Sequence, residues 1–287
     1  MPADAPAVVE EAAPAKLNLD LYVLGRRQDG YHELDSIVAF TTFGDSLTAR
    51  AADGFALTLE GPFAPALDAA GESLVRRAAF GLAELVGCAP NAALTLTKRI
   101  PLAAGLGGGS ADAAATLRAL QRLWQIEPPT AALYALATSL GADVPVCLAG
   151  RPARMHGIGD RLDAAPPLPP LELLLVNPGA PAPTGAVYQS LTAADFAPPP
   201  PRTPADAWLM QGRNALEPAA LRVQPAIAPV IAALAATDAT LVRLCGSGAT
   251  VFAAYPDPTT ADTAARTIQT TQPHWWLQRT RLVRLER

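Results

Sequence analysis

A glycine-rich loop at residues 105–109 constrains the fold of this chain more than any other stretch. Residues 95–97 before it alternate like the end of a strand, and apolar residues recur at helical spacing after it, from Ala113 to Trp124. A strand that feeds a glycine loop and then a helix leaves the first amides of the helix unpaired. Because the helix dipole adds partial positive charge there and glycine admits close approach, the pattern predicts a phosphate-binding site.

Two common phosphate loops do not fit this stretch. The P-loop ends in Gly-Lys-Ser/Thr, whereas Gly109 is followed by Ser110 and Ala111. The dinucleotide fingerprint needs a third glycine at the position of Ser110, near the start of a βαβ unit. A flexible turn is the other interpretation, although several glycines directly before a helix are an unfavourable way to build one. The loop therefore favours an anion site of a different class.

The composition excludes several kinds of protein. The chain has 287 residues, half of them hydrophobic, which is enough for two modest domains with a packed core. Its net charge is −4 and no basic stripe is present, which argues against a nucleic-acid partner. Cys88, Cys147 and Cys245 lie far apart without a C-x-x-C pair. This spacing indicates a reducing compartment and no metal site.

The first residues predict neither a leader nor an anchor. Residues 1–14 are rich in alanine, proline and acidic side chains, and they lack the basic start and apolar stretch of a signal peptide. We expect them to form a disordered arm. No apolar run reaches the roughly 18 residues of a membrane span. The protein is therefore expected to be cytoplasmic, without a membrane partner.

The order of predicted elements indicates an α+β fold with a boundary near residue 165, giving domains at 15–165 and 166–287. A proline-rich stretch at 195–204 is predicted to be a loop. Strands are expected at 16–25, 37–43, 45–50, 55–60, within 141–150, at 171–176, on both sides of 246–248 and at 280–285. Helices are expected at 72–86, after the glycine loop, and at 130–140, 205–211, 214–222, 226–236 and 259–270.

The strand at 16–25 has an unusual polar face. Alternation places Lys16, Asn18, Asp20 and Tyr22 on the same side. Only two of the 22 basic residues are lysines, Lys16 and Lys98. In a chain so rich in arginine, a lysine indicates a position where a compact ammonium is needed.

Five motifs follow one another in the order typical of one enzyme superfamily. They are 15–19 (AKLNL), 29–32 (DGYH), 101–111 (PLAAGLGGGSA), 141–145 (GADVP) and 246–249 (GSGA). Over residues 14–255 the chain resembles the GHMP kinases. The KLNL and DGYH motifs resemble the branch that acts on a cytidine diphosphate-linked polyol. The resemblance implies a two-domain α+β architecture: an N-terminal α/β domain with additional strand hairpins, and a C-terminal ferredoxin-like α/β domain.

The resemblance also implies an activity. It is transfer of a phosphoryl group from ATP to the 2-hydroxyl of a cytidylated methylerythritol, in the non-mevalonate isoprenoid pathway. Mg²⁺ is expected from this chemistry, but no carboxylate stands out as its ligand.

Asp143 matches the catalytic aspartate that accepts the hydroxyl proton, and Lys16 matches the catalytic lysine. An ammonium there would keep the carboxylate ionised and offset charge on the moving group. The residues that match the ATP-binding loop are Pro101, Leu102, Ala103, Ala104, Gly105, Leu106, Gly107, Gly108, Gly109, Ser110 and Ala111.

Other matched positions implicate a pocket for the substrate base. Tyr31 and His32 match residues that stack on cytosine and hydrogen-bond to it, and Tyr188 matches the aromatic on its other face. The remaining expected substrate-binding residues are Asn18, Gly246, Ser247 and Gly248. The chain departs from the family before its first helix, where Glu72-Ser73-Leu74 replaces the usual Asp-Asn-Leu near the adenine.

Alternatives remain at this stage. Asp143 could be a helix cap, Lys16 a solvated strand residue, Tyr188 a packing residue and 246–248 an ordinary hairpin turn. The chain could be a GHMP kinase for another small alcohol, such as homoserine or mevalonate, although DGYH argues against this. It could also be a non-catalytic nucleotide sensor, against which Lys16 and Asp143 speak together. The oligomeric state is not predicted.

Overall fold

Two long strands, β1 (Val8–Asn18) and β3 (His32–Arg50), organise the fold. The computed structural model describes residues 8–69, 73–202 and 205–283, and it separates into two units. The first unit holds residues up to 15, 44–102 and 107–150; the second unit holds 16–43, 103–106 and 151 onwards. Because β1 and β3 each contribute to both units, the division is interleaved and differs from the single boundary predicted near residue 165.

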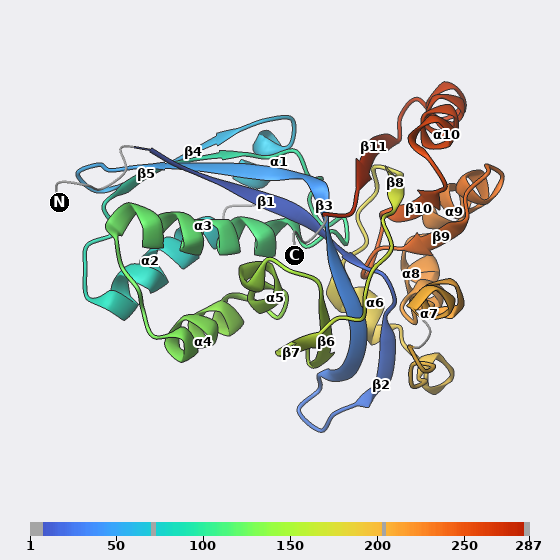
Figure 1. The fold of residues 1–287 in the computed structure, drawn as a ribbon, viewed down its shortest axis with the longest axis horizontal. Coiled ribbons are helices and arrows are strands. Elements are labelled where there is room, and N and C mark those ends of the chain that lie inside the picture. Colours follow the sequence, from blue (N-terminus) through green and yellow to red (C-terminus); the bar gives the residue numbers. More distant parts are fainter. Residues whose placement is uncertain (1–7, 70–72, 203–204, 284–287) are drawn as a thin grey trace. The chain divides into compact units, whose positions relative to one another are not determined.

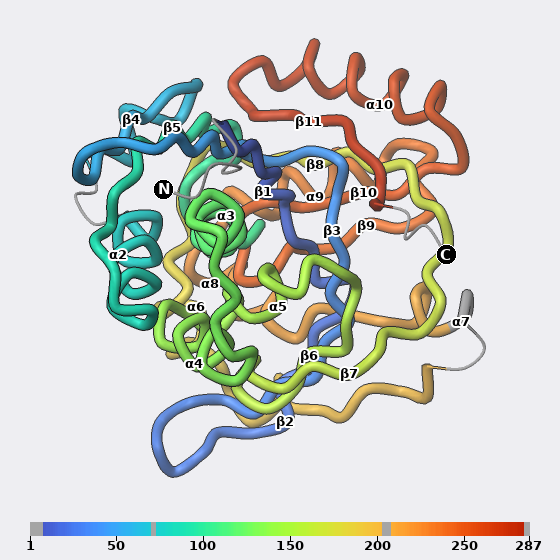
Figure 2. The backbone as a smooth tube through the Cα atoms, turned by 60° about the vertical axis from the view of Figure 1, so that its left-hand side comes forward, coloured from blue at the N-terminus to red at the C-terminus, as the bar shows by residue number. Residues whose placement is uncertain are grey.

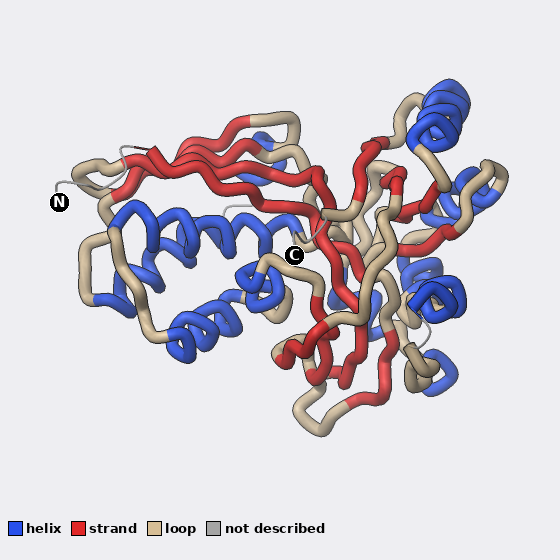
Figure 3. The backbone as a smooth tube through the Cα atoms, in the orientation of Figure 1, coloured by secondary structure: helices blue, strands red, loops and turns tan. Residues whose placement is uncertain are grey.

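In the first unit, α2 to α5 lie on one side of a small sheet (Figures 1 and 3). In this sheet β4 pairs with β5 in parallel, and β5 pairs antiparallel with the second half of β3. The helix α3 packs against both α2 and α5, and its run of alanines lets these neighbours approach closely. The elements are β4 (Phe55–Glu60), β5 (Ala92–Thr97), α1 (Ala64–Ala69), α2 (Leu74–Val86), α3 (Gly108–Trp124), α4 (Thr130–Leu140) and α5 (Val144–Ala149).

The second unit contains an antiparallel sheet in the order β11-β8-β10-β9. Figure 2 shows α10 alongside β11. In the same unit, the first half of β3 pairs with β2 and with β6, and β6 pairs with β7. The strands are β2 (Tyr22–Arg26), β6 (Ala153–Gly157), β7 (Arg161–Ala164), β8 (Glu172–Asn177), β9 (Leu241–Leu244), β10 (Val251–Tyr255) and β11 (Trp276–Arg281). The helices are α6 (Thr184–Gln189), a 3₁₀ turn (Ala193–Asp195), α7 (Ala205–Gln211), α8 (Glu217–Val223), α9 (Ile227–Ala235) and α10 (Pro258–Thr271).

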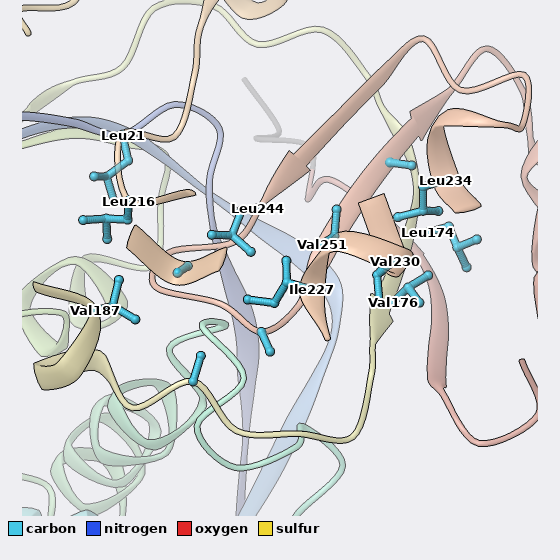
Figure 4. Close-up of a cluster of buried hydrophobic side chains, with 14 of the residues drawn as sticks. Leu21, Leu174, Val176, Val187, Leu216, Ile227, Val230, Leu234, Leu244 and Val251 are labelled. Atoms are coloured by element: carbon cyan, nitrogen blue, oxygen red, sulfur yellow. The ribbon is translucent and has the colours of Figure 1, made fainter. Parts of the chain in front are cut away.

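The core of the second unit joins this sheet to its helices (Figure 4). Val176 of β8 and Val251 of β10 face the same cluster as Ile227 and Val230 of α9, all fully buried. The continuous apolar run at 171–176 is thus a buried strand, as predicted, because both of its faces are covered. None of the helices in the described ranges is long and apolar enough to cross a membrane.

The strand predicted within residues 141–150 is wrong: the segment forms α5. Its six residues are apolar throughout, so no helical period was visible in the sequence. Pro145 sits in the first turn, where a helix tolerates proline, and Gly150 ends the helix in the left-handed region. Burial against α3 on one side and α4 on another explains the missing polar face.

The disordered arm predicted for residues 1–14 is wrong from Val8 onwards, where β1 begins. Residues 1–7 lie outside the described part of the chain. Val9 and Ala13 are completely buried, and the carboxylate of Glu11 pairs with Arg118 and Arg122 of α3. The alanine and acid that suggested disorder therefore belong to a strand whose acidic residue has partners in the first unit.

Several other predicted strand boundaries differ from those in the structure. The strands predicted at 37–43 and 45–50 are one strand, β3, and the hairpin of β6 and β7 was not predicted. The last strand is β11, several residues before the predicted 280–285, of which 284–285 lie outside the described residues. The predicted helices at 130–140, 205–211 and 259–270 are confirmed to within two residues.

The buried side chain of Asn214 is expected to be important for the second unit. Its amide donates to the carbonyls of Leu244 at 2.9 Å and Gly246 at 2.7 Å, and its oxygen accepts from the amide of Leu216 at 2.9 Å. Asn214→Ala would leave these buried backbone groups without their partner. We expect the free energy of unfolding in urea to fall by at least about 2 kcal/mol.

The matched control is Asn91→Ala. Asn91 is exposed, and its oxygen accepts a single bond from the amide of Gly54. Water can replace that bond, so the loss is expected to stay below about 1 kcal/mol. Equal losses for the two variants would contradict the structural role given to Asn214.

Candidate active site

The phosphate-loop residues of the first unit form the start of α3. Gly107 is the N-cap in the left-handed region, with φ of 64°, and the helix begins at Gly108. The amides of the first turn have no partner within an α-helix and point along its axis. Gly109 lies beside Leu74 of α2, since a Cβ added to this glycine would be 3.4 Å from Leu74 Cδ1. The segment can therefore present backbone amides to an anion.

The stretch that departs from the family lies partly in this region. Ser73 is the N-cap of α2, but its side chain makes no capping hydrogen bond. Leu74, the next residue, is the one beside Gly109. Glu72 lies outside the described residues. Leu74, of the stretch that departs from the family, thus borders the first turn of α3.

Asp143 lies at the N-cap of α5, half-buried, in the same unit. Its side chain does not hydrogen-bond to the amides of its own helix, so the capping interpretation does not explain it. The turn before it approaches the glycine loop: a Cβ added to Gly141 would be 4.0 Å from Ser110 Oγ. The structure thus brings the turn before Asp143 close to Ser110, at the end of the predicted phosphate loop.

In the second unit, the polar face of β1 is buried and hydrogen-bonded. The ammonium of Lys16 donates to Asn18 Oδ1 at 3.0 Å, and the amide of Asn18 donates to Ser36 Oγ at 2.8 Å. Ser36 in turn donates to the carbonyl of Asp20 at 2.5 Å. Lys16 is only 3% exposed, so the solvated-strand interpretation is wrong. Asn18 orients the ammonium and fixes it to β3.

The other half of the glycine loop belongs to the second unit and packs on the 246–248 turn. Gly105 has φ of +75°, and a Cβ on it would be 2.2 Å from the carbonyl oxygen of Cys245, so only glycine fits. The amide of Lys16 donates to the carbonyl of Leu106 at 2.9 Å. Within this unit the loop, the 246–248 turn and Lys16 are therefore neighbours.

The 246–248 turn also reaches the helix that carries Tyr188. Ser247 Oγ lies 2.9 Å from the hydroxyl of Thr184, the first residue of α6. A Cβ on Gly246 would be 3.4 Å from Asn18 Oδ1. The turn thus connects Asn18 to α6, which is more than an ordinary hairpin turn between β9 and β10 requires.

His32 has two aromatic rings of the second unit beside it. Its ring lies 5.3 Å from that of Tyr188 and 6.2 Å from that of Phe196. Burial lowers the pKa of His32, and Arg26 adds to this effect by repulsion. A neutral imidazole offers one donor and one acceptor, which suits the edge of a base. Phe196 was not predicted, because it lies in the proline-rich stretch.

Tyr31 is placed differently from His32. It follows the turn between β2 and β3, its amide donates to Asp29 Oδ1 at 3.1 Å, and 60% of its surface is exposed. The ring contacts of the described residues include His32 with Tyr188, but not Tyr31. The exposure argues against a packing role for Tyr31 and leaves its ring face available.

An ion-pair network holds the proline-rich stretch to the same unit. The guanidinium of Arg202 donates to both oxygens of Asp20 at 3.0 Å and to Asp35 at 2.6 Å. Arg154 also donates to Asp35, which lowers the pKa of that carboxyl against the effect of burial. An arginine alone in a proline run was the only sequence signal for this anchor. Asp20 therefore has a structural partner rather than a free carboxylate.

The described residues include no group of three or more His, Cys, Asp or Glu side chains that could hold a metal ion.

Comparison with known proteins matches the chain to one family. The GHMP kinases N terminal domain matches residues 73–151, and the GHMP kinases C terminal domain matches residues 205–274. The 4-diphosphocytidyl-2-C-methyl-D-erythritol kinase of Paramagnetospirillum magneticum is 48% identical over 92% of this chain and 95% of its own length. The enzyme of that name from Rhodospirillum rubrum is 48% identical over 96% and 93%.

The chain belongs to the 4-diphosphocytidyl-2-C-methyl-D-erythritol kinase family of the GHMP kinases. A crystal structure of 4-(cytidine 5'-diphospho)-2C-methyl-D-erythritol kinase matches it with a TM-score of 0.81 and 36% identity, covering 96% of this chain and all of that one. Homoserine kinase from Cytophaga hutchinsonii, at 18% identity and a TM-score of 0.70, covering 97% of this chain and 95% of its own, shows the shared fold alone. The predicted superfamily, the α+β fold class and an ATP-dependent kinase activity are confirmed.

The environment of His32 in this GHMP kinase can be measured directly. We expect its imidazole to titrate below the ordinary value of 6.5 in proton–carbon correlation spectra, because burial disfavours the charged form. Phe196→Ala would admit water to the ring and move the pKa of His32 back up. The resonance of the exposed His274 serves as internal reference. A pKa of His32 that is unaffected by loss of the Phe196 ring would show that this contact does not shield it.

Proposed function

We propose that this GHMP kinase transfers the terminal phosphoryl group of ATP to the 2-hydroxyl of 4-diphosphocytidyl-2-C-methyl-D-erythritol, in the non-mevalonate route to isoprenoid precursors. The observation that carries this proposal is 48% identity to kinases of that name over more than nine-tenths of both chains. ATP is the co-substrate, and the acceptor is a small molecule linked to cytidine diphosphate. A cytoplasmic location stays a prediction of the sequence.

Each reacting group has a candidate residue. Phosphoryl transfer requires positioning and charge stabilisation more than covalent chemistry. In our proposal Asp143 accepts the proton of the acceptor hydroxyl, and its carboxylate is not used in capping α5. Lys16 supplies positive charge to the transferred group, and the bond to Asn18 holds its ammonium in one orientation.

The two halves of the glycine loop are proposed to bind ATP. The first turn of α3 offers backbone amides and the positive end of a helix dipole to the phosphates. In this proposal Mg²⁺ is bound by the phosphate oxygens of ATP, since small hard cations often keep such ligands together with water. No step of the proposed reaction depends on a protein ligand to it.

The cytosine is proposed to bind at the aromatic group of the second unit. His32 lies against Tyr188 and offers its edge for hydrogen bonds, while the exposed ring of Tyr31 is available to stack on the base. Ser247 and its glycine neighbours would close the substrate side next to α6. A kinase for homoserine or mevalonate has no use for such a base pocket, and relatives at 18% and 13% identity support the fold alone.

The role of Asp143 is tested by Asp143→Asn. The variant is expected to fold and to bind ATP, but its turnover should fall by about 10²–10⁴-fold because an amide cannot take up the proton. A coupled assay with ATP and the cytidylated substrate measures this. The control is Asp53→Asn, an exposed residue of the first unit, which should retain wild-type turnover. Retention of more than about a tenth of the turnover by Asp143→Asn would remove this aspartate from the mechanism.

The role of Tyr31 separates this kinase from its relatives. Loss of a stacked ring in Tyr31→Ala should raise the KM for the cytidylated substrate about tenfold, with little change in the KM for ATP. CDP should compete with the alcohol substrate and not with ATP. The melting temperature of Tyr31→Ala should equal that of the wild type, because 60% of the Tyr31 surface is exposed.

The control for Tyr31 is Leu24→Ala, a partly exposed residue of the same hairpin. Both variants remove apolar surface from β2 or its turn, but only the first removes the proposed stacking partner. If Tyr31→Ala melts early and binds substrate normally, the cytosine pocket is not formed by this residue. The chain would then keep only its assignment as an ATP-dependent GHMP kinase.

A further inference from the structure

The second lysine of the chain, Lys98, lies in a buried cluster that the proposed mechanism does not use. Its ammonium donates to Asp45 Oδ2 at 2.5 Å and to Asp112 Oδ2 at 2.6 Å. All three side chains are at most 3% exposed and belong to the first unit. A charge buried this deeply persists only with close partners of opposite charge.

The cluster joins the chain that enters the glycine loop to the chain that leaves it. Lys98 directly follows β5, and the second oxygen of Asp45 accepts from the amides of Arg99 at 2.5 Å and Ile100 at 2.8 Å. Pro101, where the loop begins, comes next. Asp112 is in the second turn of α3, directly after the loop. One ammonium therefore holds both ends of the loop together.

The ammonium also lies directly under the first turn of α3. A Cβ added to Gly108 would be 3.0 Å from Lys98 Nζ and 3.1 Å from Ile100 Cγ2. An ammonium is compact enough for this space, whereas the larger planar guanidinium of arginine would displace the turn. This accounts for a lysine at position 98 in a chain whose basic residues are almost all arginine.

We propose that Lys98, together with Asp45 and Asp112, is a positioning residue for ATP: the cluster fixes the first turn of α3 so that its amides meet the nucleotide phosphates. This inference rests on the proposed role of the glycine loop. Lys98 acts through the backbone of Gly108 and has no contact with the reacting atoms. Without the cluster the loop ends could separate, and the amides would lose their common orientation.

The state of Asp112 is consistent with such a role. Its Oδ1 is buried and has no hydrogen-bond partner, and burial raises its pKa to about 7 against the opposing effect of Lys98. Asp45 adds to the increase by repulsion. An amide in place of this carboxyl keeps the acceptor for Lys98 without adding a buried negative charge. Asp112→Asn is therefore the conservative variant and Asp112→Ala the disruptive one.

The test measures ADP affinity by calorimetry, with CDP affinity as the readout of the second unit. Lys98→Arg and Asp112→Ala should each weaken ADP binding about tenfold or more, and Asp112→Asn should stay within about threefold of the wild type. CDP affinity should not change in any of them. In turnover assays the KM for ATP should rise, while the KM for the cytidylated substrate should stay at the wild-type value.

Thr116→Ala, one turn further along α3, is the matched buried control and should lower the melting temperature without weakening ADP binding.

Lys98→Arg retains the charge, so the test does not depend on Asp112→Ala folding. If Lys98→Arg binds ADP as the wild type does, or if Asp112→Ala melts early but binds ADP normally, the inference is overturned. Gly107→Val separates this outcome from failure of the proposed loop function, because its side chain would be strained at φ of 64° and would meet the phosphates. Normal ADP affinity in Gly107→Val would remove the loop's proposed role, whereas weakened affinity there alone would remove only the role of Lys98.

Discussion

The hydrogen-bonding register of β3 is the constraint on which the rest of the structure depends. Its 19 residues pair with β5 at one end and with β2 and β6 at the other, so this one strand contributes to the sheet of the first unit and to the β2, β6 and β7 strands of the second. Residues 34–41 of β3 are buried on both faces, and over residues 45–50 a slip by one residue would exchange the buried and the more exposed side chains. Ser36 and Asp45, which hold the two lysine sites, are therefore fixed by the same register.

Both lysines of the chain show how a protein interior can hold a charge. Lys16 has a neutral acceptor, Asn18, whereas Lys98 is paired with two carboxylates. Two carboxylates neutralise Lys98 and make it a structural tie. In our proposals Lys16 acts on the transferred phosphoryl group and Lys98 on the ends of the glycine loop, so the same type of side chain takes two roles.

The sequence predicted the elements that have a local signal, such as a helical period, prolines before a helix start or a short continuous apolar run. The amphipathic helices α4 and α10 and the buried strand β8 were expected close to their observed bounds. α5 was missed because a short helix buried on all sides has no polar face to set its period. β1 was partly missed because the partners of its Glu11 are more than 100 residues away in sequence. Ion pairs between residues far apart in the chain leave no pattern in the local sequence.

The candidate site likewise contains residues that the sequence predicted and residues that only the structure shows. The glycine loop follows from strand, glycine and helix signals, and the positions of Lys16, Asp143 and Tyr188 came from motifs that resemble one family. Phe196 and Arg202 lie in a proline-rich stretch without periodicity, so only the folded chain shows that they reach His32 and Asp20. Lys98 was noticed because the chain has only two lysines, but nothing in the sequence pointed to its partner Asp45, which lies 53 residues earlier in β3.

The interleaved division of the chain has a consequence for its synthesis. Residues 16–43 leave the ribosome early, yet their partners in the second unit follow much later. The carbonyl of Leu19 accepts from Arg243, Leu21 bonds with the backbone at Arg213, and the backbone of Phe43 bonds with Thr280. These contacts form only when nearly the whole chain has been made, whereas the pairing of β2 with β3 joins neighbouring residues. The second unit is therefore expected to complete its folding only after most of the chain has been synthesised.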